Sequence, residues 1–318
     1  METKVLLDPI SVAEQIKRLK KPKWPVDVVL DTDTFNEIDD QFALAYLVKS
    51  SDKLNLKALY AAPFLNRKAK DANEGMEKSY EEILHVLSLM EREDLHKLVF
   101  RGSNSFLPRE DKPIQSESSV HLSRLAMDYS SEKPLYVIAI GAITNVASAL
   151  LMNPEIRNRI VVIWLGGHSY DWHDTFEFNM RQDVAAARVV FGCGVPLIQL
   201  PCMGVVSAFT ISGPELEYWL RGKNKLCDYL VDVTSKEALA DGGLTTWTRI
   251  IWDVAAVGWL TGDFMLDRLE YSPIPEYSHR YSFCKSRHMI RYVYHINRDM
   301  LFNDLFSVLT RPDGIVKS

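Results

Sequence analysis

Five carboxylates crowd into one ten-residue segment that directly follows an apolar run, and it reads Asp31-Thr32-Asp33-Thr34-Phe35-Asn36-Glu37-Ile38-Asp39-Asp40. Like charges this close repel one another unless a cation or strong hydrogen-bond donors lie nearby. Carboxylate oxygens are hard ligands that suit Ca²⁺ or Mg²⁺. A helix N-terminus whose dipole favours acids would explain only Asp39 and Asp40. Asp31 and Asp33, at the end of the apolar run, therefore indicate a metal site.

Two other motifs that use closely spaced acids fit this segment less well. An EF-hand loop needs Asp, Asn or Ser at its fifth position and Gly at its sixth, where this chain has Phe35 and Asn36. Phosphotransferases with an Asp nucleophile also begin with a strand and Asp-x-Asp, but they usually carry Thr or Val at the position of Phe35. Neither a later Lys with an acidic pair nor a phosphate-binding basic residue at a strand end is evident. A metal-dependent phosphatase is therefore a weaker alternative.

The elements that must position these acids alternate between strands and helices along the first 200 residues. Strands are expected at 27–30, 56–62, 98–100, 135–140, 160–165 and 196–200. Helices are expected at 39–50, 76–90, 120–129, 143–151 and 183–190. Several of the strands are apolar on both faces, which predicts an α/β fold with an open, mostly parallel sheet flanked by helices.

Ligands of such sheets bind beyond the carboxyl ends of the strands. The loops after Leu30, Ala62, Ile140 and Leu165 should therefore form the pocket. Beyond residue 205 we expect four more helices, whose order in space the sequence does not reveal, near 213–221, 224–237, 253–260 and 300–310.

Composition bounds the class of protein. The chain has 318 residues, of which 47% are hydrophobic, and no internal repeat or linker, so we expect a single domain over 1–318. A net charge of -5 gives no global basic field for nucleic acid, and the basic run 17–23 is interpreted as a solvated approach to the first strand. The most apolar stretch, 134–152, reads as a buried strand and helix, so no membrane span is expected. Four cysteines without a CxxC motif, and no signal peptide in residues 1–8, favour a cytoplasmic location.

At the acidic segment the chain resembles the nucleoside hydrolase family, the inosine–uridine-preferring type. That family opens with a strand, then Asp-Thr-Asp-Pro-Gly-x-Asp-Asp, then an apolar helix. Asp31-Thr32-Asp33 and Asp39-Asp40 match its two acidic pairs. Further segments are similar in the same order, at 99–102, 138–147, 165–167, 177–179, 183–191 and 252–256. The chain departs from the family at residues 34–38, which replace Pro-Gly-x and make the acidic loop two residues longer, so that the loop must bulge to keep both acidic pairs on one ion.

The resemblance implies a Ca²⁺ ion at the bottom of the pocket. Its ligands would be Asp33, Asp40, the backbone carbonyl of Thr144, and Asp253. Asp33 would also act as the general base on a metal-bound water that attacks the anomeric carbon of ribose. Thr144 and Asp253 have an alternative role as caps of the helices that follow them.

The resemblance also implies how a riboside would be held. Asp39, Glu177 and Asn179 would bind ribose hydroxyls, and Asn66 is expected to replace an Asn that the family has after its second strand. Towards the leaving base, some family members carry a His where this chain has Trp252, which could stack on a base or belong to the core. His168 and His173 could reach the leaving group or be surface histidines.

We therefore predict a Ca²⁺-dependent N-ribosyl hydrolase that splits a nucleoside or a related riboside, working as a homodimer or homotetramer. The main alternative is a catalytically altered homologue that binds a sugar or riboside with the same ion. The preferred base and the leaving-group acid are not readable from the sequence.

Overall fold

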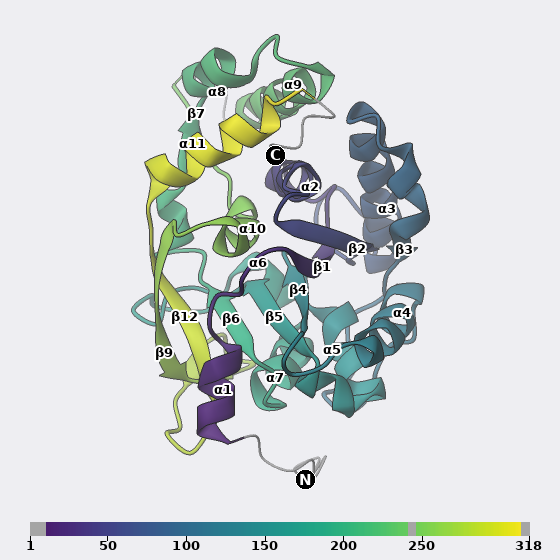
Figure 1. Ribbon diagram of the computed structural model, residues 1–318, viewed down its shortest axis with the longest axis vertical. Coiled ribbons are helices and arrows are strands. Elements are labelled where there is room, and N and C mark those ends of the chain that lie inside the picture. The colour runs from purple at the N-terminus through teal and green to yellow at the C-terminus, as the bar shows by residue number, and fades with distance from the viewer. Residues whose placement is uncertain (1–10, 241–245, 313–318) are drawn as a thin grey trace.

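An eight-stranded sheet forms the centre of the computed structural model, which describes residues 11–240 and 246–312 (Figure 1). Its strands lie in the order β3-β2-β1-β4-β5-β6-β12-β9, and only the last pair is antiparallel. Their bounds are β1 (Val26–Thr32), β2 (Leu54–Ala61), β3 (Val99–Arg101), β4 (Leu135–Ala139), β5 (Ile160–Leu165), β6 (Leu197–Leu200), β9 (Met265–Tyr271) and β12 (Met289–Ile296).

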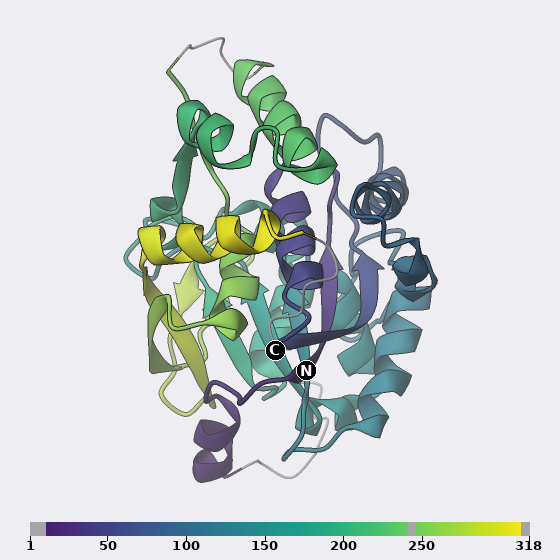
Figure 2. The same ribbon diagram turned by 45° about the horizontal axis from the view of Figure 1, so that its top comes forward.

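Helices cover both faces of this sheet (Figures 1 and 2). On one face lie α2 (Asp39–Lys49), α3 (Ala72–Leu89) and α10 (Val254–Thr261), with α8 (Gly213–Leu220), α9 (Lys225–Ala240) and α11 (Arg298–Leu309) packed beyond them. On the other face lie α4 (Glu117–Leu125), α5 (Thr144–Met152) and α7 (Val184–Gly192). Two short helices, α1 (Val12–Arg18) and α6 (Phe178–Gln182), lie outside these layers.

Strict alternation of side chains along the central strands creates two separate cores. In β1, Val28 and Leu30 point into the core under α2 and α10, whereas Val29 points into the core under α5. In β5, Trp164 packs on the α5 side, and its neighbours Ile163 and Leu165 pack on the other. Because successive residues of a strand face opposite sides, a continuous apolar run is what a sheet covered on both faces requires.

The direction of strand order reverses between β1 and β4. From β1 the chain adds β2 and then β3 to one side, and from β4 it adds β5 and β6 to the other. Such a switch point leaves a crevice beyond the carboxyl ends of the two central strands. The acidic segment begins at the carboxyl end of β1, so the fold places it at this crevice.

The predicted fold class is confirmed, and every strand and helix expected before residue 200 is present. The four later helices also form, as α8, α9, α10 and α11. The sequence analysis missed β9 and β12, and also two small pairs, β7 (Thr210–Ser212) with β8 (Thr248–Ile250) and β10 (Ile274–Pro275) with β11 (Tyr281–Ser282). These strands are at or near edges and carry charged and exposed residues, so they lack the apolar run of a central strand.

Other sequence-based expectations are not tested by the fold. No helix among the described residues is long and apolar enough to cross a membrane. Residues 1–8, in which no signal peptide is expected, lie outside the described residues. The single domain, the cytoplasmic location and the homodimer or homotetramer stay predictions.

A buried amide ties together the ends of the central strands. The Nδ2 atom of Asn145 donates to Asp31 Oδ1 at 2.8 Å and to the carbonyl of Ala61 at 3.3 Å. Its Oδ1 atom accepts from the backbone N–H of Ser103 at 2.7 Å and from the Ser103 hydroxyl at 2.8 Å. Gly102 leaves room for this amide, because a Cβ atom there would lie 2.6 Å from Asn145 Nδ2. Asn145 thus joins the carboxyl ends of β1 and β2 to the segment that follows β3.

Replacing Asn145 by Ala should lower the free energy of unfolding by about 3 kcal/mol, since it leaves several buried polar groups without partners. Urea unfolding of the variant measures this loss. The matched control is Asn55→Ala. Among the described residues its exposed amide donates to Asp27 alone, and it should contribute less than about 1 kcal/mol. Equal losses in the two variants would show that the buried amide has no special structural weight.

Candidate active site

A cavity of about 430 Å³ opens at the crevice between β1 and β4. Eight of the eleven sequence-predicted site residues line it. The full lining is Asp33, Asn36, Glu37, Asp39, Asp40, Ile140, Leu165, His168, Phe176, Glu177, Phe178, Asn179, Arg181, Cys202, Met203, Trp252 and Asp253. Carboxylates are the largest class of polar group in this lining, so the cavity is strongly acidic.

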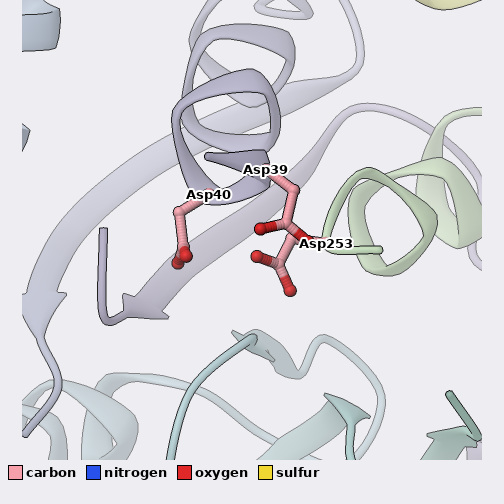
Figure 3. A group of neighbouring side chains, drawn as sticks. All are labelled: Asp39, Asp40 and Asp253. Carbon is pink, nitrogen blue, oxygen red and sulfur yellow. The ribbon is translucent and has the colours of Figure 1, made fainter. Parts of the chain in front are cut away.

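Three buried carboxylates meet on one side of the cavity, where α2 and α10 begin (Figure 3). One oxygen from each of Asp39, Asp40 and Asp253 lies within 4.8 Å of the others. Asp39 and Asp40 form the first turn of α2, and Asp253 directly precedes α10. Because α2 and α10 pack against each other, their N-termini bring together acids that are more than two hundred positions apart in the sequence.

Asp33 adds a fourth carboxylate that is buried without a partner. Neither of its oxygens has a hydrogen-bond partner in the part of the chain that the structure describes. The close approach of Gly141 leaves little space behind it, since a Cβ atom there would lie 2.9 Å from Asp33 Oδ1. A buried, unpartnered carboxylate is costly, and an all-oxygen donor set is the one that a hard divalent cation requires. These residues therefore fit a divalent cation.

Burial and mutual repulsion shift the acids of this cluster in one direction. Burial, followed by repulsion from Asp40 and Asp39, raises the pKa of Asp33 well above its ordinary value. Burial likewise raises the pKa of Asp253 well above its ordinary value, and repulsion from Asp39 is the next cause. Burial also raises the pKa of Asp39 well above its ordinary value, and repulsion from Glu37 is the next cause. Asp40 is raised by burial to a pKa of about 7, although its hydrogen bond from the Thr32 hydroxyl opposes the shift. Without a cation, the cluster holds protons that isolated carboxylates would release.

The longer acidic loop forms part of the cavity wall. Asn36 and Glu37 both line the cavity, and the Asn36 N–H donates to the Asp33 carbonyl at 2.7 Å. Asn66 Nδ2 donates to Asn36 Oδ1 at 2.7 Å, and Lys68 Nζ donates to the Asn36 carbonyl at the same distance. The loop after β2 thus holds the acidic loop in place, whereas the predicted bulge of two additional residues stays a prediction.

Backbone groups position Glu177 and Asn179, which also line the cavity. The Glu177 carboxylate caps α6, accepting from the N–H groups of Asn179 at 2.8 Å and Met180 at 2.9 Å, and also from Gly167 at 2.9 Å. Asn179 Nδ2 donates to the carbonyls of Ile140 and Leu165, each at 3.0 Å. Both amide hydrogens of Asn179 are thus engaged, and its Oδ1 remains for a ligand.

The two histidines after β5 lie in different environments. His168 lines the cavity, and its Nδ1 accepts from the Met203 N–H at 3.2 Å, which places the hydrogen on Nε2. Burial lowers the pKa of His168 and favours the neutral ring. His173 is 77% exposed, pairs with Asp174 at 3.1 Å, and is absent from the described lining. Only His168 is placed to meet a ligand in this cavity.

Two other predicted site residues lie outside the described lining. The Asn66 amide binds Asn36, as above, and its Oδ1 accepts from the Lys68 N–H at 2.8 Å. Thr144 opens α5, and its hydroxyl donates to Asp183 Oδ2 at 2.7 Å. Asp183 itself caps α7, because its Oδ1 accepts from the Ala186 N–H at 2.9 Å.

The sequence analysis missed an aromatic and cationic group at the cavity. Arg181 lines the cavity with its guanidinium 4.9 Å from the ring centre of Phe176 and 5.2 Å from that of Phe178. Cation–π contacts of this kind hold an arginine in a defined orientation. Trp252 is partly buried against the core while it also lines the cavity. No spacing in the sequence singles out Arg181, because it is the tertiary structure that brings α6 to the cavity.

Comparison with known proteins gives a consistent result. The model of the family described as "Inosine-uridine preferring nucleoside hydrolase" matches residues 28–279. The pyrimidine-specific ribonucleoside hydrolase RihA of Salmonella paratyphi A is 27% identical over 193 residues, which are 54% of this chain and 58% of that protein. RihA of Salmonella enteritidis is 26% identical over the same share. The matched region thus spans little more than half the length of these curated relatives.

Solved structures share the fold over a larger part of the chain. A plant nucleoside hydrolase superposes with a TM-score of 0.71 and 18% identity, covering 91% of this chain and all of the other. A purine-preferring ribonucleoside hydrolase from Gardnerella vaginalis gives a TM-score of 0.68 and 17% identity, covering 89% and 98% of the two chains. At these identities the likeness concerns the fold.

The acidic cluster predicts how pH and metal affect stability. Because the folded pKa of Asp40 is raised from 3.8 to about 7, the folded state holds a proton there that the unfolded state releases. In chelator, this carboxyl should therefore make the protein less stable as the pH rises from about 4 to 7. An excess of divalent cation should replace the proton and reduce the loss. Melting temperatures between pH 4.5 and 8, with and without cation, measure both effects.

The variant Asp40→Asn isolates this contribution from other groups that titrate in the same range. It should flatten the decline in chelator and weaken the stabilisation by cation. Asp263→Asn is the matched control, because that side chain is 94% exposed and should leave both effects unchanged. A decline with pH that is the same in both variants would contradict the prediction.

Proposed function

The chain belongs to the inosine–uridine preferring nucleoside hydrolase family, and from this we propose that it hydrolyses the N-glycosidic bond of a ribonucleoside or a related riboside. The observation that carries the proposal is the unpartnered, buried carboxylate of Asp33 next to the acids of α2 and α10. A buried carboxylate without a hydrogen-bond partner is suited to abstract a proton from a water molecule in the cavity.

We propose Ca²⁺ as the cation of the acidic cluster. Asp33, Asp40 and Asp253 would supply side-chain oxygens, and the family resemblance adds the backbone carbonyl of Thr144. When bound, the ion supplies a positive charge that lowers the pKa of a water molecule in the cavity. The buried carboxylates of the cluster then keep their negative charge at neutral pH, because the cation offsets the repulsion that otherwise protonates them.

Asp33 acts as the general base in this proposal. Its carboxylate accepts a proton from the attacking water, and the oxygen of that water bonds to the anomeric carbon of the ribose. As the glycosidic bond to the leaving nucleobase breaks, positive charge develops on the sugar ring, as it does in other glycoside cleavages. The surrounding carboxylates, Asp39 and Glu177 among them, stabilise that charge electrostatically.

Ribose hydroxyls supply the contacts that select the sugar. Asp39 belongs to the acidic cluster, and Glu177 and Asn179 line the same cavity. Because these groups are buried, a ligand without the matching hydroxyls would leave an acceptor such as Asn179 Oδ1 without a partner, which is costly. Asn66 reaches this sugar site only through its hydrogen bond to Asn36.

The leaving base is assigned to the side of the cavity formed by Trp252 and His168. Trp252 precedes Asp253, so an aromatic ring adjoins the acidic cluster where some family members carry a histidine. The neutral His168 can donate from Nε2 to a base atom, as its Nδ1 is engaged by Met203. His173, which is exposed, takes no part in this arrangement.

Replacing Asp33 by Ala or Asn should lower riboside turnover by about 10²- to 10⁴-fold with little loss of folding, because it removes the general base. Release of reducing ribose from a panel of purine and pyrimidine ribosides measures turnover, with and without chelator. Chelator should abolish activity in the unmodified chain. The control Asp171→Asn alters an exposed acid of the nearby loop and should retain activity.

Unchanged turnover in both Asp33 variants would remove the assigned base. If no riboside is turned over by the unmodified chain while ribose still binds, the catalytically altered binding homologue becomes the better account. Hydrolysis of phosphate esters in place of ribosides would favour the metal-dependent phosphatase.

Trp252→Ala tests the proposed stacking on the base. Since base–aromatic stacking contributes about 1–3 kcal/mol, kcat/KM for purine ribosides should fall roughly tenfold or more, and by a larger factor than for pyrimidine ribosides. Trp247→Ala is the control, because Trp247 packs on the core outside the described lining. A Trp252 variant that loses stability but keeps kcat/KM for every riboside would assign the ring to the core.

A further inference from the structure

A second cavity, of about 320 Å³, lies at the opposite end of the central strands from the acidic cavity. It is lined by the chain that leads from α1 into β1 and by the chain that leads into β4, so it adjoins the amino ends of the two central strands. In Figure 1, α1 lies at the lower end of the molecule, away from α2 and α10. β1 has seven residues, which corresponds to about 23 Å of extended chain. This separation excludes the second cavity from the proposed active site.

The charged side chains that line this cavity are mostly basic, in a protein whose net charge is -5. Two carboxylates, Asp27 and Glu132, oppose six cations, which are Lys17, Arg18, Lys20, Lys21, Lys23 and Lys133. The charge of Asp27 is already compensated, because Lys57 lies 3.2 Å away and the hydroxyl of Tyr129 donates to it at 2.9 Å. An excess of positive charge therefore remains.

Several of these cations have no acidic partner. Lys21 pairs with Asp263 at 2.9 Å, and Lys17 lies 3.9 Å from Glu14. By contrast, Lys20, Lys23 and Lys133 have no carboxylate within 4.0 Å in the ranges 11–240 and 246–312. Lysines that are not engaged in ion pairs are available to an external anion.

Arg18 distinguishes this cavity from an ordinary patch of surface lysines. Its side chain is buried, with 5% of the residue exposed, and no described carboxylate forms an ion pair with it. Nη2 donates to the carbonyls of Arg157 and Ile160, at 3.0 and 3.4 Å, whereas Nε is buried without a described hydrogen-bond partner. Glu14 and Glu132 attract this guanidinium from a distance without forming an ion pair with it. A buried guanidinium that has no ion pair is costly, and an anion bound near it would lower that cost.

We propose that this basic cavity binds a phosphorylated small molecule. Guanidinium and ammonium groups form their strongest hydrogen bonds with carboxylate and phosphate oxygens, and arginine suits phosphate in particular. The volume falls within the range of small-molecule sites, and Tyr136 adds an aromatic wall next to the cations. A compact cavity in an acidic chain favours a small ligand over nucleic acid, which needs an extended basic surface. The proposal does not depend on the hydrolase activity.

The experiment is a calorimetric titration of the full chain at low ionic strength with inorganic phosphate, with ribose 5-phosphate and with ribose. Both phosphates should bind, and the variant Lys20→Glu/Lys23→Glu should weaken their binding by about tenfold or more. Arg18→Gln should also weaken it. The control Lys97→Glu/Lys225→Glu introduces the same change of charge at exposed positions outside the cavity and should change the affinity less than about twofold. Binding of ribose alone should be the same in all variants.

Three results would overturn the proposal. The first is that neither phosphate binds at millimolar concentration. The second is that Lys20→Glu/Lys23→Glu and its control weaken binding equally, which would indicate general attraction by the net charge. The third is that a single-stranded RNA oligomer binds more tightly than either phosphate and depends on Lys20 and Lys23, which would identify a nucleic-acid surface.

Discussion

Mutual repulsion among buried carboxylates is the constraint on which the rest of the structure depends. The four acids concerned are Asp33, Asp39, Asp40 and Asp253. Water normally solvates charged carboxylates, but burial removes that water. Each carboxyl therefore either keeps a proton or shares a cation. The charged state that a shared cation allows is the one that suits the proposed function, in which positive charge develops on a sugar ring. The surrounding fold serves to keep these groups together against their own repulsion.

The fold keeps the four acids together through the geometry of the backbone, without a described ion pair to a basic side chain. The cluster lies at the switch point of a parallel sheet, where the N-termini of α2 and α10 converge. A helix N-terminus carries a partial positive charge, so each of these helices offsets part of the acidity. Behind the cluster, the amide of Asn145 links Asp31 to the loops that follow β2 and β3. Rigid placement is what allows a carboxylate such as Asp33 to remain unpartnered.

The charge distribution of the molecule is polarised along its central strands. Acids gather beyond the carboxyl ends of β1 and β4, whereas cations gather beyond their amino ends around Arg18. The net charge of -5 is a sum over the whole chain and does not show this separation. Two ligands of opposite charge can thus bind at the two ends of the same central strands without competing.

The sequence by itself determined the alternating strands, the fold class and the acids of the first loop, because these depend on local patterns of apolar and charged residues. It also indicated Asp253, although only by resemblance to a family. Tertiary structure decided which side chains meet: it brought Asp253 to α2, turned His168 inward and left His173 exposed, and engaged Asn66 with the bulged loop. The physical reason is that contacts between distant segments depend on how helices and strands pack, and single-residue spacing carries no record of that packing.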